Sequence, residues 1–330
     1  MASQQATQSR PAPKRPIPTN PAINLIGTDN ADVMIGDSNS NTYSSGAGND
    51  LMYASAGSDS LSGGAGVDIL DYSRVNADLT FSRGGIMAKS GGLGTDTISG
   101  FDIEVIKANP NKINTIDGST GTTASLNVNL SNNLLTINNL PGIGSASLTV
   151  ENFQNVRGSE NADIITGSSG ENDLSGGSGD DLISGLSGSD KLTGGAGNDT
   201  FRFGRGDSLL NGFDRITDLQ IGADQIDGLV ASSSVRNFGS ASSLSAGDLS
   251  QVLNNRSFGS NLAASFTLGS GDSTRTFLAL NDNRAGFQAN NDMLIEITGY
   301  SGNLSDLQIV WTYYFKFYAL APLAIDQINL

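Results

Sequence analysis

Residues 176–203 read GGSGDDLISGLSGSDKLTGGAGNDTFRF, a stretch rich in Gly, Ser and Asp. Its glycines lose much backbone freedom on folding, and its aspartates repel one another. Its serines add little apolar surface that could be buried. The composition therefore gives no reason for the segment to fold, and the reason has to come from the order of its residues.

A nine-residue period runs through this stretch and through an earlier one. Residues 158–202 divide into GSENADIIT, GSSGENDLS, GGSGDDLIS, GLSGSDKLT and GGAGNDTFR, and residues 27–71 into GTDNADVMI, GDSNSNTYS, SGAGNDLMY, ASAGSDSLS and GGAGVDILD. The sixth residue of every unit is Asp or Asn, and the eighth is apolar or aromatic. A flexible Gly/Ser linker has no reason to keep this phase over five units, twice. Both blocks are predicted to be folded repeats.

Positions six and eight each keep one kind of residue in all ten units. Position six is occupied by Asp32, Asn41, Asp50, Asp59, Asp68, Asp163, Asn172, Asp181, Asp190 and Asp199. Position eight is occupied by Met34, Tyr43, Met52, Leu61, Leu70, Ile165, Leu174, Ile183, Leu192 and Phe201.

The units GGAGVDILD, GGSGDDLIS and GGAGNDTFR match the G-G-x-G-x-D-x-U-x nonapeptide. In these units the chain resembles the RTX, or hemolysin-type, calcium-binding proteins. The resemblance implies a turn over the first six residues of each unit, a short strand over the last three, and position eight in the core. Two units would form one 18-residue coil of a right-handed parallel β-roll. It also implies Ca²⁺ between turns stacked on one edge, bound by position-six carboxylates and by backbone carbonyls of the glycine turn.

Elementary chemistry agrees with this resemblance. Ca²⁺ prefers about six to eight oxygen ligands from carboxylates and carbonyls, and glycine lets a turn bend its carbonyls toward one point. Stacked strands lie about 4.8 Å apart, so Asp at residue n and Asp at n+18 become neighbours. Without metal such a pair would repel by roughly 3 kcal/mol at an effective dielectric constant of about 20. Metal binding is therefore expected to supply much of the folding energy.

The n+18 rule gives six candidate ligand pairs, with those that contain Asn expected to be weakest because they lose a charge. The pairs are Asp32–Asp50, Asn41–Asp59, Asp50–Asp68, Asp163–Asp181, Asn172–Asp190 and Asp181–Asp199. The strongest candidates are residues 45–50 over 63–68, and 176–181 over 194–199. The glycines expected to contribute to metal binding are Gly46, Gly48, Gly63, Gly64, Gly66, Gly176, Gly177, Gly179, Gly194, Gly195 and Gly197.

One further match lies outside the two blocks. GGLGTDTIS, residues 91–99, fits the nonapeptide fully but begins 28 residues after Gly63, out of phase with the repeats. It is interpreted as an ordinary tight turn without stacked neighbours. Whether GGLGTD at 91–96 binds calcium stays open.

Charge and missing residue types exclude several classes of function. The chain has 330 residues and a net charge of −15, of which the two repeat blocks carry −13. Such a concentration of acid disfavours nucleic acid as a partner and favours a cation. There is no His and no Cys, which excludes Ser-His-Asp and Cys-His catalysis and His-ligated zinc.

The chain divides into five predicted segments. Residues 1–22 form a disordered Pro-rich tail without the apolar region of a signal peptide. RTX repeat block 1 spans 23–71 and block 2 spans 158–203. Between them, 72–157 is a β-rich insert that either continues the solenoid without calcium or forms a small separate β-domain. Residues 204–330 form a C-terminal β-rich capping domain with a secretion signal.

Patterns within these segments are more specific. In the insert, apolar residues alternate around a turn at 131–133, and residues 103–118 look like a coil that has lost its carboxylates. Residues 213–229 resemble the strand pair that follows the repeats in serralysin-like secreted proteins. Its four Asp residues are interpreted first as solvated turn acids, with a further ion site as the alternative. Residues 276–302 are similar to a C-terminal domain of cyanobacterial surface RTX proteins. The aromatic run 311–318 is interpreted first as a buried edge strand, with an export signal or a membrane or partner contact as alternatives.

The sequence therefore predicts an all-β protein with a calcium-dependent β-roll. The resemblance implies export by type I secretion machinery and an extracellular or cell-surface location. The expected role is structural or adhesive, without catalysis, with calcium ions and cell-surface or matrix glycans as partners. Two alternatives stay open: a secretion and folding module of an extracellular enzyme or toxin, and a polysaccharide-active enzyme.

Overall fold

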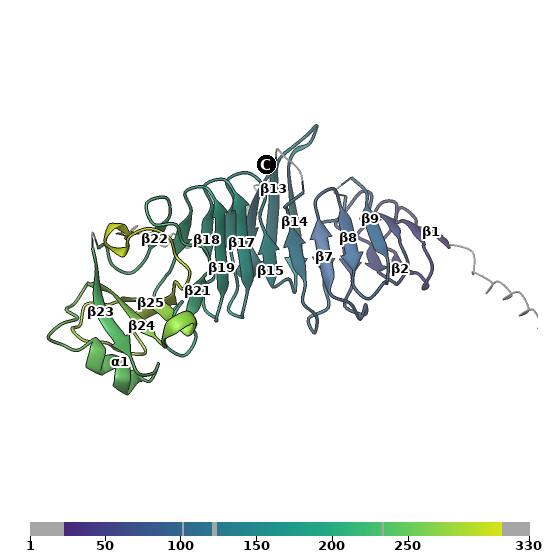
Figure 1. The fold of residues 1–330 in the computed structure, drawn as a ribbon. Helices are drawn as coiled ribbons and strands as arrows, with labels where there is room; N and C mark the ends of the chain where they lie inside the picture. Colours follow the sequence, from purple (N-terminus) through teal and green to yellow (C-terminus); the bar gives the residue numbers. More distant parts are fainter. Residues whose placement is uncertain (1–22, 101, 121–123, 233, 312–330) are drawn as a thin grey trace, which may run out of the picture.

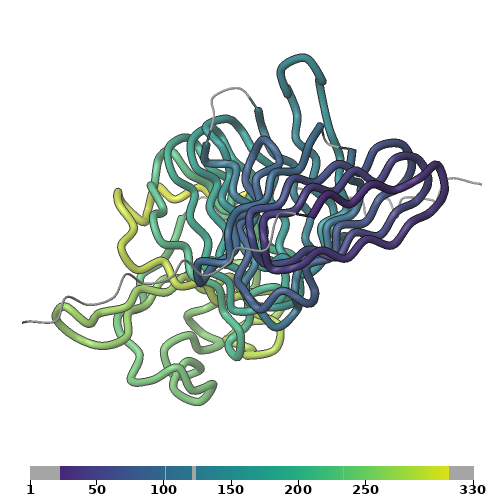
Figure 2. Tube along the Cα trace, turned by 90° about the vertical axis from the view of Figure 1, so that its right-hand side faces the viewer, coloured from purple at the N-terminus to yellow at the C-terminus, as the bar shows by residue number. Residues whose placement is uncertain are grey.

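The computed structural model describes residues 23–100, 102–120, 124–232 and 234–311. The predicted N-terminal tail and the aromatic run after Trp311 lie outside these residues. Within them the strands form two long sheets that run side by side along an elongated body (Figure 1). Seen along this body, the coils lie behind one another as flattened loops (Figure 2). None of the helices in this part is long and apolar enough to cross a membrane.

Almost every strand is short, and in the repeat blocks successive strands belong alternately to the two sheets, so that each coil contributes one strand to each. The first sheet has the order β1 (Asn24–Ile26), β3 (Thr42–Ser44), β5 (Ser60–Ser62), β9 (Thr95–Ile98), β8 (Ile86–Lys89), β7 (Leu79–Ser82), β11 (Thr115–Asp117), β15 (Asn155–Arg157), β17 (Asp173–Ser178), β19 (Lys191–Ala196), β21 (Asp214–Ile216), β26 (Met293–Glu296), β25 (Arg275–Leu280), β24 (Ala263–Leu268) and β23 (Val235–Ala241). The second has the order β2 (Val33–Ile35), β4 (Leu51–Tyr53), β6 (Ile69–Asp71), β10 (Val105–Lys107), β14 (Gly144–Glu151), β13 (Leu134–Leu140), β12 (Ser125–Asn129), β16 (Ile164–Thr166), β18 (Leu182–Ser184), β20 (Thr200–Arg202), β22 (Gln225–Asp227) and β27 (Gln308–Val310).

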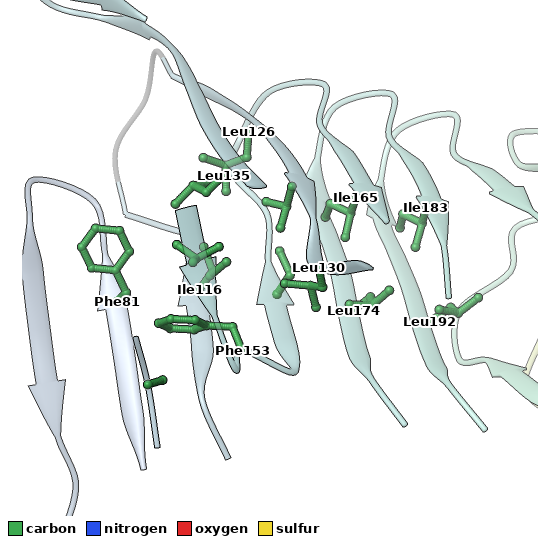
Figure 3. Close-up of a cluster of buried hydrophobic side chains, with 14 of the residues drawn as sticks. Phe81, Ile116, Leu126, Leu130, Leu135, Phe153, Ile165, Leu174, Ile183 and Leu192 are labelled. Carbon is green, nitrogen blue, oxygen red and sulfur yellow. The ribbon is translucent and has the colours of Figure 1, made fainter. Parts of the chain in front are cut away.

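The strand register confirms the 18-residue coil in both blocks. Leu51 pairs in parallel with Ile69, and Leu182 pairs in parallel with Thr200. All ten side chains at position eight are buried, from Met34 at 5% exposed to Phe201 at 0%. They form one continuous core that passes through the insert, as the row from Phe81 to Leu192 shows (Figure 3). The predicted β-roll and its apolar interior are confirmed.

The insert continues the two sheets, which is the first of the two arrangements considered for it. β10 pairs in parallel with β6, and β11 with β7 and β15. In each sheet one parallel step is replaced by an antiparallel meander, β7–β8–β9 in the first sheet and β12–β13–β14 in the second. The predicted turn between β12 and β13 is present as a 3-10 turn, η1 (Leu130–Asn132).

The C-terminal end of the roll is covered by a small domain with its own core. It contains α1 (Ala246–Val252), two 3-10 turns, η2 (Gly271–Ser273) and η3 (Leu304–Asp306), and the strands β23 to β26. Phe266 and Phe277 stack at 5.3 Å between ring centroids inside this second apolar cluster. β26 pairs in parallel with β21, so the cap joins the first sheet directly.

Candidate calcium sites between stacked turns

A ladder of hydrogen bonds connects the position-six residues of successive coils. The backbone N–H of Asp50 donates to Oδ1 of Asp68 at 2.8 Å, and that of Asp163 to Oδ1 of Asp181 at 2.8 Å. The N–H of Asp181 donates to Oδ1 of Asp199 at 3.0 Å. The ladder brings together the residues n and n+18 that the sequence paired, and it uses one oxygen of each carboxylate.

The other carboxylate oxygen is often left without a partner. Within the described residues, buried Oδ2 atoms that accept no hydrogen bond belong to Asp50, Asp68, Asp181, Asp190, Asp199 and Asp214. A buried, unpaired carboxylate oxygen is costly unless a cation or a proton satisfies it. These atoms are the strongest structural indication that the stacked turns hold a cation.

At two of these turns the unpaired oxygen faces a backbone carbonyl of the next coil across a glycine. A Cβ added to Gly176 would lie 2.0 Å from Oδ2 of Asp181 and 2.7 Å from the carbonyl oxygen of Gly194. One placed on Gly63 would lie 2.6 Å from Oδ2 of Asp68 and 2.1 Å from the carbonyl oxygen of Asp102. Gly176 and Gly63 cannot be replaced without filling the space on which these two oxygens converge. The requirement is local, because Ser45 occupies position one of the unit that contains Asp50.

The residue at position two decides which carboxylates are left unpaired. Where it is Ser or Thr, its hydroxyl donates to the position-six side chain four residues on, as Thr28 does to Asp32, Ser55 to Asp59, Ser159 to Asp163 and Ser168 to Asn172. Where it is Gly, as before Asp50, Asp68, Asp181 and Asp199, or Leu, as before Asp190, Oδ2 has no partner among the residues that the structure describes. This signal was visible in the sequence, but the prediction gave position two only a backbone role.

The Asn residues use their amide groups to fill the turn. Nδ2 of Asn41 donates to the carbonyl oxygens of Asp37 and Asn39 at 3.1 and 2.7 Å, and that of Asn172 donates to Gln154 at 2.7 Å. An amide donor satisfies carbonyls that would otherwise be available to a cation. This contact is a second reason to expect the Asn-containing pairs to be the weakest sites, beside the loss of charge on which the prediction was made.

Burial gives the carboxylates of the second block unusual proton affinity. It raises the pKa of Asp181 to about 8 and that of Asp190 to about 7, and the charges of neighbouring acids add to the effect. The pKa of Asp199 rises to about 6 and that of Asp214 to about 8 for the same first reason. Carboxylates that resist ionisation when alone are suited to bind a cation that restores the negative form.

The ligand set fits a hard cation that accepts backbone oxygens. No three Asp or Glu side chains in the described parts of the chain gather closely enough to hold a metal by themselves. Each site must therefore combine one or two carboxylates with carbonyl oxygens. Ca²⁺ accepts such a mixed set of oxygens, whereas zinc favours His and Cys, which this chain lacks.

The interpretation of residues 91–99 as a turn without stacked neighbours is wrong. β9 pairs in parallel with β5, and the N–H of Asp59 donates to Oδ1 of Asp96 at 2.9 Å. A Cβ on Gly94, which has φ of +95°, would lie 2.0 Å from the carbonyl oxygen of Gly57. The meander of β7 and β8 carries the chain away and returns it to the same edge, so the unit stacks 37 residues later instead of 18.

The interpretation of the acids after the second block as solvated is also wrong for three of the four. Asp214, Asp224 and Asp227 are at most 4% exposed. The N–H of Asp190 donates to Asp214, and that of Asp199 donates to Asp224, at 2.9 and 3.0 Å. Asp214 and Asp224 continue the ladder on the two edges of the roll, at spacings of 24 and 25 residues, because the connecting loops are longer than a turn.

At the end of the first block, two acids that the sequence prediction missed meet Asp68. The N–H of Asp68 donates to Oε2 of Glu104 at 2.7 Å, and Asp102 accepts from the Gly64 N–H while its buried Oδ1 has no partner. The pKa of Asp68 is raised, first by burial and further by these neighbouring charges.

Comparison with known proteins supports the identity of the repeats. The RTX calcium-binding nonapeptide repeat matches in four copies, over residues 24–52, 44–76, 154–183 and 175–210. No curated protein sequence matches the chain.

Two solved structures show weaker similarity. The AlgE6R3 subunit of the Azotobacter vinelandii mannuronan C5-epimerase is 25% identical over 54% of this chain and 84% of its own, with a TM-score of 0.31. The extracellular lipase LipA of Serratia marcescens is 15% identical over 89% of this chain and 41% of its own, with a TM-score of 0.24. Both TM-scores are low, and it is the strand pairing of this chain that establishes its fold. With four matched copies on two stacks of turns, this chain carries RTX calcium-binding nonapeptide repeats in both of its blocks.

Proposed function

We propose that this is a secreted or surface-exposed structural protein whose β-roll folds when its stacked turns bind extracellular Ca²⁺. The observation that carries the proposal is the pair Asp181 and Asp199, whose buried Oδ2 atoms have no hydrogen-bond partner within the described residues. Bound calcium provides the positively charged partner that these two carboxylate oxygens need.

Three sets of residues have different roles in this proposal. The position-six carboxylates Asp50, Asp68, Asp181, Asp190 and Asp199, together with Asp214, provide charged ligands. The glycine turns bring carbonyl oxygens such as that of Gly194 to the same points. The position-eight side chains supply the apolar core, but each three-residue strand buries only one of them, so the core alone gives limited stability.

Dependence on calcium also supports a place outside the cell. At low calcium concentration the repeats would stay unfolded and could pass through type I secretion machinery, and the higher concentration outside would fold them. The acids with strongly raised pKa in the second block belong to the turn stacks, where they serve ion binding. We therefore propose a structural or adhesive role, with surface or matrix glycans as partners, and no catalysis.

The test is circular dichroism and urea unfolding of the full chain in EDTA and in millimolar Ca²⁺. We expect a large loss of β-structure in EDTA and recovery on adding calcium. The double variant Asp181→Asn/Asp199→Asn should lose most of the calcium response of the second block. Asp173→Asn is the matched control, because Asp173 lies in the same block but is half-exposed and paired with Lys191. Equal β-structure and equal unfolding midpoints with and without calcium would contradict the proposal.

A further inference from the structure

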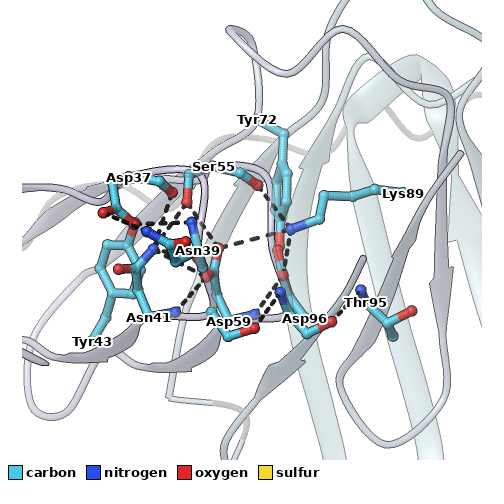
Figure 4. Close-up of polar contacts among 12 residues, drawn as sticks. Asp37, Asn39, Asn41, Tyr43, Ser55, Asp59, Tyr72, Lys89, Thr95 and Asp96 are labelled. Carbon is cyan, nitrogen blue, oxygen red and sulfur yellow. Dashed lines mark hydrogen bonds and ion pairs between the residues drawn. The ribbon is translucent and has the colours of Figure 1, made fainter. Parts of the chain in front are cut away.

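One buried cation in the roll comes from the chain itself. Lys89, at the end of β8, is 5% exposed, and its ammonium group lies between the position-six carboxylates of two stacked turns (Figure 4). Nζ donates to Oδ1 of Asp96 and, at 2.8 Å, to the carbonyl oxygen of Ser55, and it lies 3.7 Å from Oδ2 of Asp59. All three ammonium hydrogens therefore have an oxygen to face.

The two turns around Lys89 have the backbone of a calcium-type stack. Asp59 and Asp96 are linked by the same ladder hydrogen bond that links Asp181 to Asp199. Gly94 approaches the carbonyl of the turn below, Gly57, as closely as Gly197 approaches Gly179, with 2.0 Å from an added Cβ to oxygen in both cases. The stacking geometry therefore does not distinguish this pair of turns from those with unpaired carboxylates.

The difference lies in how the carboxylates are satisfied. Oδ2 of Asp59 accepts from the Ser55 hydroxyl at 3.0 Å, and Oδ2 of Asp96 accepts from the buried Tyr72 hydroxyl at 2.8 Å. Neither side chain is among those with an unpaired buried oxygen. Protein donors and one protein cation thus complete this stack.

We propose that Lys89 is a tethered cation that replaces Ca²⁺ between the turns 54–59 and 91–96, so that this level of the roll folds without calcium. The inference rests on the proposed calcium binding by the other stacks and deepens it: one of the stacked levels is closed to the ion. It also predicts that a calcium site is latent under the lysine, formed by Asp59, Asp96 and the Ser55 carbonyl.

The antiparallel meander explains how the Lys89 side chain reaches the stacked turns. β8 runs antiparallel beside β9, so its last residue lies next to the turn that begins the 91–99 unit. In an uninterrupted stack of nonapeptides every strand pairs in parallel with the strand of the next coil. The residues that follow each strand then form the next turn of the same coil, and no other strand ends beside that turn. The antiparallel detour therefore brings a long cationic side chain to an edge otherwise made only of turns.

The experiment compares wild type with Lys89→Met, which keeps the length of the side chain and removes the charge. Calcium uptake of the full chain is measured by calorimetry. Terbium, which takes calcium-like oxygen sites, is followed by emission sensitised through nearby tyrosine. We expect Lys89→Met to bind one more ion than wild type and to gain terbium emission, because Tyr72 donates directly to Asp96. Its unfolding midpoint should fall in EDTA and recover in calcium.

Lys89→Met/Asp96→Asn is the control for position, and it should bind no additional ion. An unchanged ion count in Lys89→Met, with the midpoint lowered equally in EDTA and in calcium, would overturn the proposal. If wild type bound no calcium, the proposed function would fail, while a gain of one ion by Lys89→Met would still support the tethered cation.

A measurement on the wild type covers the case in which Lys89→Met does not fold. Hydrogen exchange of amides in 57–61 and 95–98 should be equally slow in EDTA and in calcium. Amides in 177–183 and 195–201 should exchange much faster in EDTA. Equal loss of protection in all four segments would show that Lys89 does not replace the ion.

Discussion

The stack of Asp59 on Asp96 and the stack of Asp181 on Asp199 share the same hydrogen bond from a backbone N–H to a carboxylate between turns but differ in the other partners of their carboxylates. In the first, an ammonium group and two hydroxyls meet the carboxylates. In the second, each carboxylate keeps a buried oxygen without a partner. Two turns with the same stacking geometry can therefore differ in how the side chains around them satisfy the carboxylates, which is the basis of the proposed distinction between calcium and Lys89.

The largest effect is expected on the pH dependence of the stability of the second block in EDTA. Burial raises the folded-state pKa of Asp181 and Asp214 to about 8, above the ordinary value of 3.8. The folded state then binds more protons than the unfolded state, so its stability is greatest at low pH and is lost as pH rises toward 8. We expect the calcium-free second block to be markedly more stable at pH 5 than at pH 8.

Calcium should reverse this trend, because its carboxylate ligands bind as anions. Three neighbouring acids face Asp181, namely Asp163, Asp180 and Asp199, and they act in the same direction. Urea unfolding of the full chain from pH 5 to pH 8, in EDTA and in calcium, checks this. Stability in EDTA that rises with pH would contradict it.

The next largest effect is expected when the contact between Lys89 and Asp96 is removed. Asp96→Asn removes the carboxylate that holds Lys89 and leaves a buried ammonium group with a weaker set of oxygens. Breaking a buried pair in this way typically costs about 3–5 kcal/mol. The free energy of unfolding should fall by a similar amount in EDTA and in calcium, as measured by urea titration. A loss that appears in calcium alone would mean that Asp96 binds the ion.

Asp199→Asn should behave in the opposite manner. It removes a ligand, so the stabilisation by calcium should shrink by about 2.7 kcal/mol at a calcium concentration 100 times the dissociation constant. In EDTA the variant should be at least as stable as wild type, because a buried charge without a partner is gone. Parallel thermal unfolding of both proteins measures the two signs, and destabilisation of equal size in both buffers would argue against a ligand role.

The smallest effect is expected from a substitution at position one, which tests whether the turn needs the space that glycine leaves. Gly194→Ala would place a Cβ 2.3 Å from Oδ2 of Asp199, which should cost about 1–3 kcal/mol and weaken calcium binding. Gly170→Ala is the control, since its added Cβ would have no contact closer than 3.9 Å and its φ is not positive. Calorimetric titration and chemical unfolding of both variants test the difference, and equal behaviour would exclude a spatial requirement at Gly194.

The nine-residue pattern was sufficient to predict much of this molecule. It gave the parallel roll, the 18-residue register, the buried row from Met34 to Phe201, and the neighbouring positions of Asp181 and Asp199. The reason is local: in an uninterrupted repeat each coil has the same length, so the strand ladder fixes which residue lies over which. The individual ion ligands and the domain boundaries stay predictions.

Only the tertiary structure decided what happens where the repeat is interrupted. Asp96 joins its ladder after 37 residues, Asp214 after 24 and Asp224 after 25. The cost of closing a loop changes slowly with its length, so the sequence inside a detour says little about where the chain returns. Lys89 depends on the same fact, because it reaches Asp96 only through an antiparallel strand that the period does not contain. The period determined which residues of the repeats stack over one another, and the return of the chain decided which side chains from outside the repeat meet them.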